Sequence, residues 1–210
     1  MNRIVSLVAL LGCVSTPAFA DEIMDFYLVQ SGGTSEASPA VSSTQLNYRV
    51  CNSSNSDQQA LLKMNVIGSG LVPAGSTITS ATLRLKAEVG GDGLMYRAGE
   101  TWDNTPTWDE VGDVLTAGGF IGVGLNTGQS MEFNVASHVQ LWADGTSNQG
   151  WVIKGSSDDC QAARIYNGSA STSNRPRLTV VFVPPDTTAP QVMDIDVGSS
   201  VSTHADYDVP

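Results

Sequence analysis

Short runs of alternating apolar and polar residues recur along the chain between residues 23 and 183. The clearest is 78–86, in which Ala81, Leu83 and Leu85 alternate with polar residues. A period of two is typical of a β-strand with one buried face. About ten such runs, separated by turn residues, predict an all-β chain. They cover 23–29, 46–51, 61–66, 78–86, 94–98, 118–124, 131–135, 151–154, 163–166 and 177–183.

Two of these runs lie in the stretch 60–88, which contains the strongest pattern in the chain. Between the two runs, Gly70, Pro73 and Gly75 interrupt any periodic structure. We therefore expect two strands joined by a proline–glycine loop, forming a hairpin at the centre of a sheet.

One segment changes to helical spacing. Val135, Val139 and Trp142 would lie on one face of a helix that Asn134 can cap and Gly145 can end. One short helix among many short strands predicts an antiparallel β-sandwich of the jelly-roll type.

Residues 1–20 have the organisation of a secretory signal peptide. Arg3 precedes an apolar stretch, and Ala18-Phe19-Ala20 gives a small-x-small cleavage site. The alternative, a lipoprotein box ending at Cys13, would leave a very short apolar stretch before the cysteine. Elsewhere the chain has no apolar run of about twenty residues, the length that spans a bilayer. We expect a secreted, extracellular protein without membrane insertion.

The net charge of the chain limits the classes of partner that it can be expected to bind. Charged residues make up 15% of the chain, and its net charge is −11. An acidic protein repels a phosphate backbone, which argues against nucleic acid as a partner. The same field disfavours strongly acidic polysaccharides.

Two cysteines remain once the signal peptide is removed, Cys51 and Cys160. In an exported chain this number predicts one disulfide, although two unpaired thiols stay open as an alternative. Two cysteines are also too few for a closed zinc site without several histidines.

Catalytic motifs are absent from the sequence. It contains no G-x-S-x-G, no H-E-x-x-H and no phosphate-binding loop in a strand–helix context. Asp103, Asp109 and Glu110 could form the carboxylate pair of a glycosidase. A solvated acidic loop or calcium ligands explain them as well, and no D-x-D-x-D-G loop supports a calcium site. We expect no enzymatic activity and no cofactor, leaving only a structural calcium ion open.

Several segments together resemble the secreted bacterial DNRLRE domain, which overlaps carbohydrate-binding module family 96. The resemblance covers about residues 23–183, but Tyr166-Asn167-Gly168 lies where the family has an S-R-E triplet. The matching segments are ALLKMN (60–65), PAGSTI (73–78), ATLRL (81–85), MYRA (95–98), the TW pairs at 101–102 and 107–108, the predicted helix, NQGW (148–151) and RPRLTVVF (175–182).

The resemblance implies a non-catalytic module that binds polysaccharide and belongs to a larger extracellular protein. Trp102 and Trp108 could stack on sugar rings, and Arg97 and Arg164 could bind a sugar carboxylate. The alternative roles are loop anchors for the two tryptophans and a solvated strand face for the two arginines. Trp142 and Trp151, which lie on apolar patterns, are expected in the core. The alternative function is a structural or adhesive spacer of a cell-surface protein.

The domain organisation follows from the same pattern. We expect a folded domain over 21–183, a proline-rich linker over 184–191 and an acidic tail over 192–210. The tail is too short to bury a core. It resembles the start of an immunoglobulin-like or fibronectin-like domain, which would imply further domains in the same polypeptide, and a disordered tail is the alternative.

Overall fold

The computed structural model describes residues 20–50, 57–67, 71–103, 105–111, 116–156 and 162–187. The predicted signal peptide (1–20), apart from its last residue, and the tail (192–210) lie outside this part of the chain. So do Cys51 and Cys160, which leaves the expected disulfide a prediction.

Strands dominate the described residues, and all the strand pairs within them are antiparallel. The predicted all-β fold with a short helix after residue 134 is therefore confirmed. The strands are β1 (Glu22–Ser35), β2 (Leu46–Tyr48), β3 (Gln58–Met64), β4 (Thr77–Val89), β5 (Gly91–Ala98), β6 (Thr116–Leu125), β7 (Ser130–Asn134), β8 (Trp151–Gly155), β9 (Ala163–Ile165) and β10 (Arg177–Val183). The helices are α1 (Trp108–Val111) and α2 (Ala136–Ala143).

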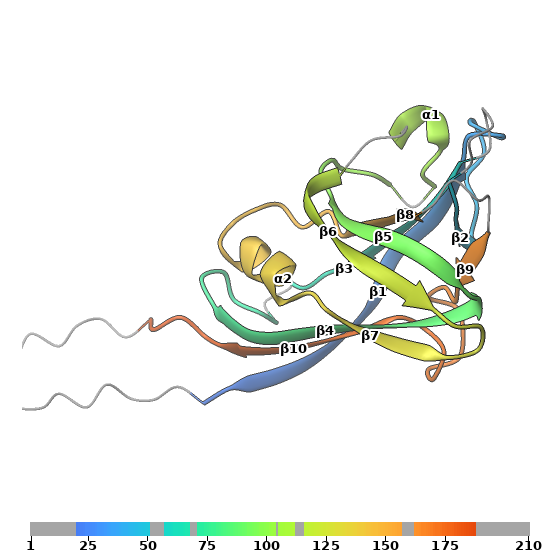
Figure 1. Ribbon diagram of the computed structural model, residues 1–210. Helices are drawn as coiled ribbons and strands as arrows, with labels where there is room; N and C mark the ends of the chain where they lie inside the picture. Colours follow the sequence, from blue (N-terminus) through green and yellow to red (C-terminus); the bar gives the residue numbers. More distant parts are fainter. Residues whose placement is uncertain are drawn as a thin grey trace, which may run out of the picture.

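The strands form two layers that share β1 (Figure 1). The first half of β1 pairs with β10, and its second half pairs with β3 after a shift of register between Leu28 and Gln30. One layer is β7-β4-β10-β1 and the other is β1-β3-β8-β5-β6, while the β2–β9 pair extends the end of β4. Since β1 runs to Ser35, the loop expected after residue 30 begins later than predicted.

The prediction of a hairpin within 60–88 is wrong, although both of the predicted strands exist. β3 pairs with β1 and β8, whereas β4 pairs with β10, β7 and β9. The segment between them crosses from one layer to the other and buries Val66 and Val72 on the way. Each strand thus covers the shared core from its own side, and the apolar faces meet across the layers.

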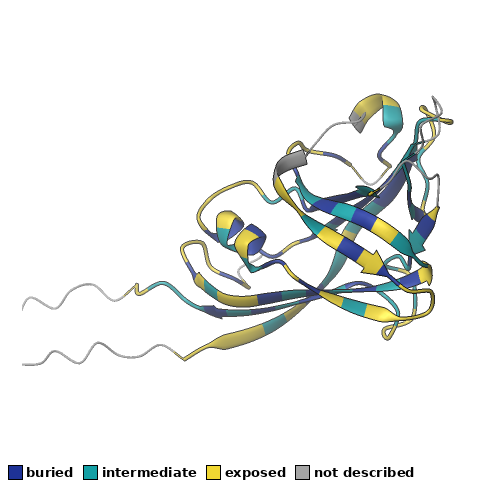
Figure 2. Ribbon diagram, in the orientation of Figure 1, coloured by how far each residue is buried: buried dark blue, intermediate teal, exposed yellow. Residues whose placement is uncertain are grey.

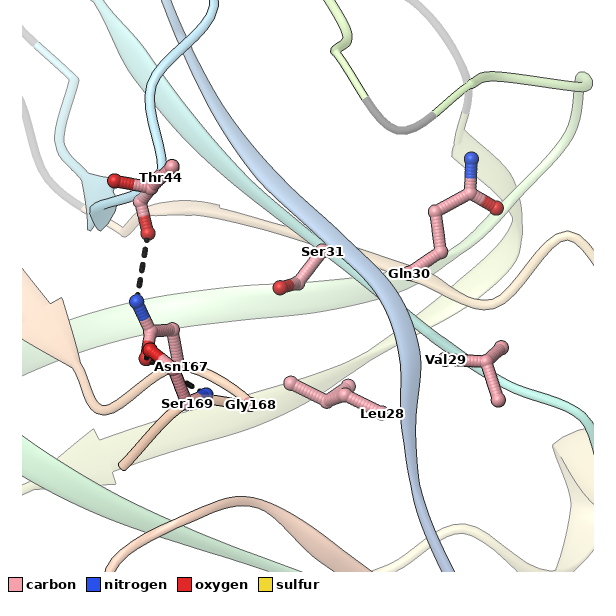
Figure 3. Close-up of a pocket in the computed structure, with 8 residues that line it drawn as sticks. All are labelled: Leu28, Val29, Gln30, Ser31, Thr44, Asn167, Gly168 and Ser169. Carbon is pink, nitrogen blue, oxygen red and sulfur yellow. Dashed lines mark hydrogen bonds between the residues drawn. The ribbon is translucent and has the colours of Figure 1, made fainter. Parts of the chain in front are cut away.

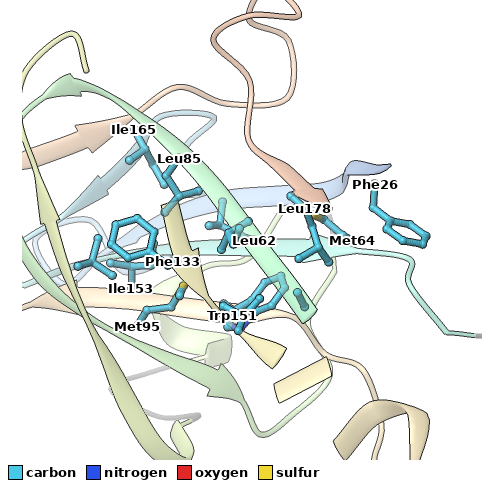
Figure 4. Packing of buried hydrophobic residues seen from close by; sticks show 14 of the residues in the cluster. Phe26, Leu62, Met64, Leu85, Met95, Phe133, Trp151, Ile153, Ile165 and Leu178 are labelled. Carbon is cyan, nitrogen blue, oxygen red and sulfur yellow. The ribbon is translucent and has the colours of Figure 1, made fainter. Parts of the chain in front are cut away.

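The core lies between the two layers (Figure 4). Leu62, Met95 and Ile153 come from one layer, and Leu85 and Leu178 come from the other. Buried and exposed residues alternate along the strands (Figure 2), as the period-two pattern requires. Trp142 and Trp151 are in this core, as predicted, with ring centroids 4.8 Å apart in an edge-to-face arrangement.

Helix α2 covers the open side between the layers (Figure 1). Asn134 Oδ1 accepts a hydrogen bond from the Ala136 N–H at 3.0 Å, and Gly145, with φ of +102°, follows the last turn. Gln140 ties the helix to the start of β4, because its Oε1 accepts from the Ile78 N–H at 2.7 Å and its Nε2 donates to the Ser76 carbonyl at 3.1 Å.

Candidate functional site

Trp102 does not offer the open indole face expected of a stacking residue, since it is only 5% exposed. Its Nε1 donates to the Gln149 carbonyl at 2.8 Å, and its own carbonyl accepts from Gln30 Nε2 at 2.8 Å. The ring packs in a small second cluster on the outer side of β3 and β8. The other members of this cluster are Leu61, Ala98, Val152 and the partly buried Tyr96. For Trp102 the structure therefore favours the loop-anchor alternative.

Trp108 is half-buried and begins α1, a helical turn that was not predicted. Glu110 Oε2 accepts from the Thr107 N–H at 3.1 Å, which is one half of a capping box. The Thr-x-x-Glu signature of this box is visible in the sequence and was missed. Both Asp103 and Glu110 accept hydrogen bonds from their own loop, and the two acids line one hollow with Trp102.

The two arginines lie apart from this loop. Arg164 on β9 forms an ion pair with Glu88 on β4, so a sugar carboxylate would have to displace an existing partner. Arg97 on β5 lies opposite Trp151 in register. It also contributes to the electrostatic environment of His138 on α2. The four predicted ligand-binding residues therefore occupy separate elements of the fold.

His138 serves the core rather than a reaction. It is 7% exposed, and its Nδ1 accepts a hydrogen bond from the Trp151 indole at 3.1 Å. Burial, and after it the charge of Arg97, lowers the pKa of His138, so the imidazole is neutral at pH 7. Among the described residues, no three histidine, cysteine or acidic side chains are grouped so that they could hold a metal ion. Nor does any helix described here have the length and apolar character to cross a membrane.

Three basic residues contact the segment 171–175 or belong to it. Lys86 Nζ donates to Asn174 Oδ1 at 2.8 Å, and Arg84 Nη2 donates to the Ser173 carbonyl at 3.3 Å. The Arg175 guanidinium lies 3.8 Å from the centre of the Tyr27 ring. These contacts anchor the segment to the outer faces of β4 and β1. The three residues are Arg84, Lys86 and Arg175.

An aromatic pair, one exposed ring and one partly buried ring, occupies the outer face of β5 and β6. Phe120 is 59% exposed, and its ring centroid lies 5.8 Å from that of Tyr96, at an interplanar angle of 59°. Beside this pair, Leu94 is opposite Gly122, and Asp92 is opposite Gly124. We call these six residues the aromatic face. Two of its six positions are glycines, which leave the backbone of β6 uncovered.

A shallow hollow of about 280 Å³ lies along the glycine side of the aromatic face. Gly122 has open space where a side chain would stand, and a Cβ on Gly124 would meet only Asp92 Oδ1, at 3.4 Å. Asp92 and Ser156 supply polar groups at its border. An apolar ring next to an unobstructed strip of backbone can hold a flat ligand with one apolar side and one polar edge.

The sequence signal for this face is the segment Phe120-Ile121-Gly122-Val123-Gly124. Its alternation places Val123 in the core and Phe120 outside. The predicted strand 118–124 was correct, but a glycine-rich strand gave no reason to choose its exposed side over the tryptophan loop.

A second hollow of about 350 Å³ lies where β1 passes from one layer to the other (Figure 3). Leu28 and Ser31 point toward the loop of Asn167, while Gln30 and Val29 point away from it. Asn167 Nδ2 donates to the Thr44 carbonyl at 3.1 Å, which holds the two walls together. The Asn167 side chain is also an acceptor for Ser169, so most of its hydrogen-bonding capacity is already used.

Comparison of the chain with models of known protein families, and with curated proteins, finds no match in either.

Proposed function

We propose that this protein is a secreted, non-catalytic carbohydrate-binding module and that the aromatic face is its binding surface. The observation that carries the proposal is the exposed Phe120, packed against the partly buried Tyr96, beside the uncovered backbone of Gly122 and Gly124. Sugar rings present C–H faces that pack on aromatic rings, and their equatorial hydroxyls bond to polar groups at the border. The resemblance of the sequence to carbohydrate-binding module family 96 points to the same class of ligand.

The charge distribution favours a neutral or weakly charged polysaccharide at this face. The face itself contains Asp92, and the chain carries a net charge of −11. A strongly acidic chain laid across it would meet like charge. Binding at the aromatic face therefore depends on stacking and hydrogen bonds.

A structural spacer remains a second candidate, and one observation favours it. Trp102 is buried and anchors its loop, as a spacer without a sugar site requires. The spacer does not call for the exposed Phe120 ring beside the hollow of Gly122 and Gly124.

Affinity gel electrophoresis against a panel of neutral and acidic polysaccharides tests the proposal. Phe120→Ala should weaken retention by about tenfold, or about 1.4 kcal/mol, because it removes the stacking surface. Gly122→Val should weaken it as strongly, since the new side chain fills the strip on which the ligand lies. Neither change should lower the melting temperature, because Phe120 is exposed and the space beside Gly122 is open.

Two matched controls test whether the same kinds of substitution outside the aromatic face also weaken retention. Ile23→Ala removes an apolar side chain that is 70% exposed on the other layer, and Gly119→Val adds a side chain into open space on the same strand, outside the hollow. Both controls should keep full retention. Equal retention of the Phe120→Ala and control proteins would overturn the aromatic face as the binding surface. No retention of the wild-type protein by any polysaccharide would favour the spacer.

A further inference from the structure

A third hollow, of about 280 Å³, is built by the second half of β1, the segment 38–45, β2 and the start of β3. We call it the hydroxyl pocket. Eight of its ten lining residues carry a hydroxyl or an amide, and none carries a charge. The exposed Val41 is its one apolar side chain.

The walls of the hydroxyl pocket are fixed by backbone pairing. Gly33 and Ser43 exchange two backbone hydrogen bonds, of 2.7 and 2.9 Å, and Gln58 and Arg49 exchange two of 3.0 Å. A Cβ on Gly33 would lie within 2.1 Å of the Gln45 carbonyl, so the close approach of the two segments requires glycine there. The pocket is therefore a preformed feature of the fold.

Thr34 gives the pocket an unused polar group. It is 3% exposed, lines the pocket, and its Oγ1 has no hydrogen-bond partner. A buried hydroxyl without a partner costs about 1–3 kcal/mol, so such groups are uncommon in folded proteins. Asn47 and Gln45 provide amide groups in the same lining, joined by only a long hydrogen bond of 3.4 Å.

We infer that the hydroxyl pocket binds one uncharged sugar residue, separately from the aromatic face. Its volume is at the lower end of the range for ligand sites, which suits a single ring and not a continuous chain. A charged sugar would enter without a counter-charge in the lining, which is unfavourable. Hydroxyls and amides can both donate and accept, and they match the alternating hydroxyls of a neutral sugar. This inference deepens the proposed function, because it adds a second subsite for the same class of ligand.

Saturation-transfer NMR on the whole protein tests the pocket with glucose, galactose, mannose and N-acetylglucosamine, together with glucuronate and glycerol as comparison probes. At least one neutral sugar should receive saturation, and glucuronate should not. Thr34→Val should weaken binding of that sugar by about fivefold, since it removes one hydrogen-bonding group. It should keep or raise the melting temperature, because the lost hydroxyl has no partner in the unliganded protein. Asn47→Ala is a second variant with the same expected loss of binding.

Two controls keep the outcomes separate. Thr82→Val makes the same chemical change on β4, and Ile23→Ala changes the exposed start of β1, both outside the pocket; both should leave binding of the single sugar unchanged. Saturation of glycerol alone, meaning binding of an adventitious additive only, would overturn the inference. So would sugar binding that Thr34→Val and Asn47→Ala both leave intact. If the wild-type protein binds a single sugar but no polysaccharide retains it in the gel, the proposal for the aromatic face is wrong and the inference about the hydroxyl pocket stands.

Discussion

His138 joins α2 to the core, and its ionisation makes the stability of the protein depend on pH. Its neutral imidazole accepts the hydrogen bond of the buried Trp151 indole, and burial followed by the charge of Arg97 lowers its pKa below the ordinary value of 6.5. The unfolded chain therefore binds a proton at this residue more readily than the folded protein does. Its contribution to stability is complete above about pH 6.5 and is lost as the pH falls from there toward the lowered pKa of the folded state.

We therefore expect the free energy of unfolding, measured by urea denaturation, to be lower at pH 5.5 than at pH 7.5. His138 can contribute at most about 1.4 kcal/mol per pH unit to this difference. His138→Asn is the control, because an amide oxygen can accept the Trp151 N–H without titrating. Other ionisable groups are common to both proteins and cancel in the comparison. An equal loss of stability in the two proteins would mean that His138 does not cause the pH dependence.

At the scale of elements, the attachment of α2 depends on Gln140. Its side chain bonds to both the Ile78 N–H and the Ser76 carbonyl at the start of β4. Gln140→Ala should lower the free energy of unfolding by about 1–3 kcal/mol, measured by chemical denaturation, because two partly buried backbone groups lose their partner. Gln129→Ala, in the exposed turn before β7, should change it by less than about 0.5 kcal/mol. Similar effects of the two changes would contradict this role.

The elements also show what the sequence could predict. Each strand was recognisable because its core side chains, such as Leu83 and Leu85, recur with a period of two. The pairing of β3 was not recognisable. An apolar face does not specify whether the next strand in the sequence pairs beside it or packs across the core. In the same way, the tryptophans indicated aromatic surface but not exposure, which depends on the Gln149 carbonyl that binds Trp102. The exposed side of β6 follows from its register with β5, which is a tertiary property.

At the scale of the whole molecule, antiparallel pairing of β1 with β10 places both ends of the described domain at one tip (Figure 1). Glu22 lies opposite Phe182, so the segments that precede and follow the domain leave together. The aromatic face lies on β5 and β6, at the far edge of the other layer. A module attached by this tip could present the face to a polysaccharide without obstruction by its neighbours.

The remaining prediction concerns the covalent closure of the domain. Cys51 and Cys160 lie outside the described residues, but residue 50 and the end of β8 are described. These two segments are in close contact. A Cβ on Gly155, at the end of β8, would lie only 2.5 Å from the backbone nitrogen of Val50, which precedes Cys51. Four residues lie between Gly155 and Cys160, enough chain to reach a neighbouring thiol.

We expect thiol counting on the denatured, unreduced mature protein to find no free cysteine. Reduction should then lower the free energy of unfolding by about 4 kcal/mol, because the bond closes a loop of about a hundred residues and restricts the unfolded chain. The Cys51→Ser/Cys160→Ser double variant should have the stability of the reduced protein and should not respond to reductant. Two free thiols in the wild-type protein would show that the adjacent segments are held by backbone packing alone.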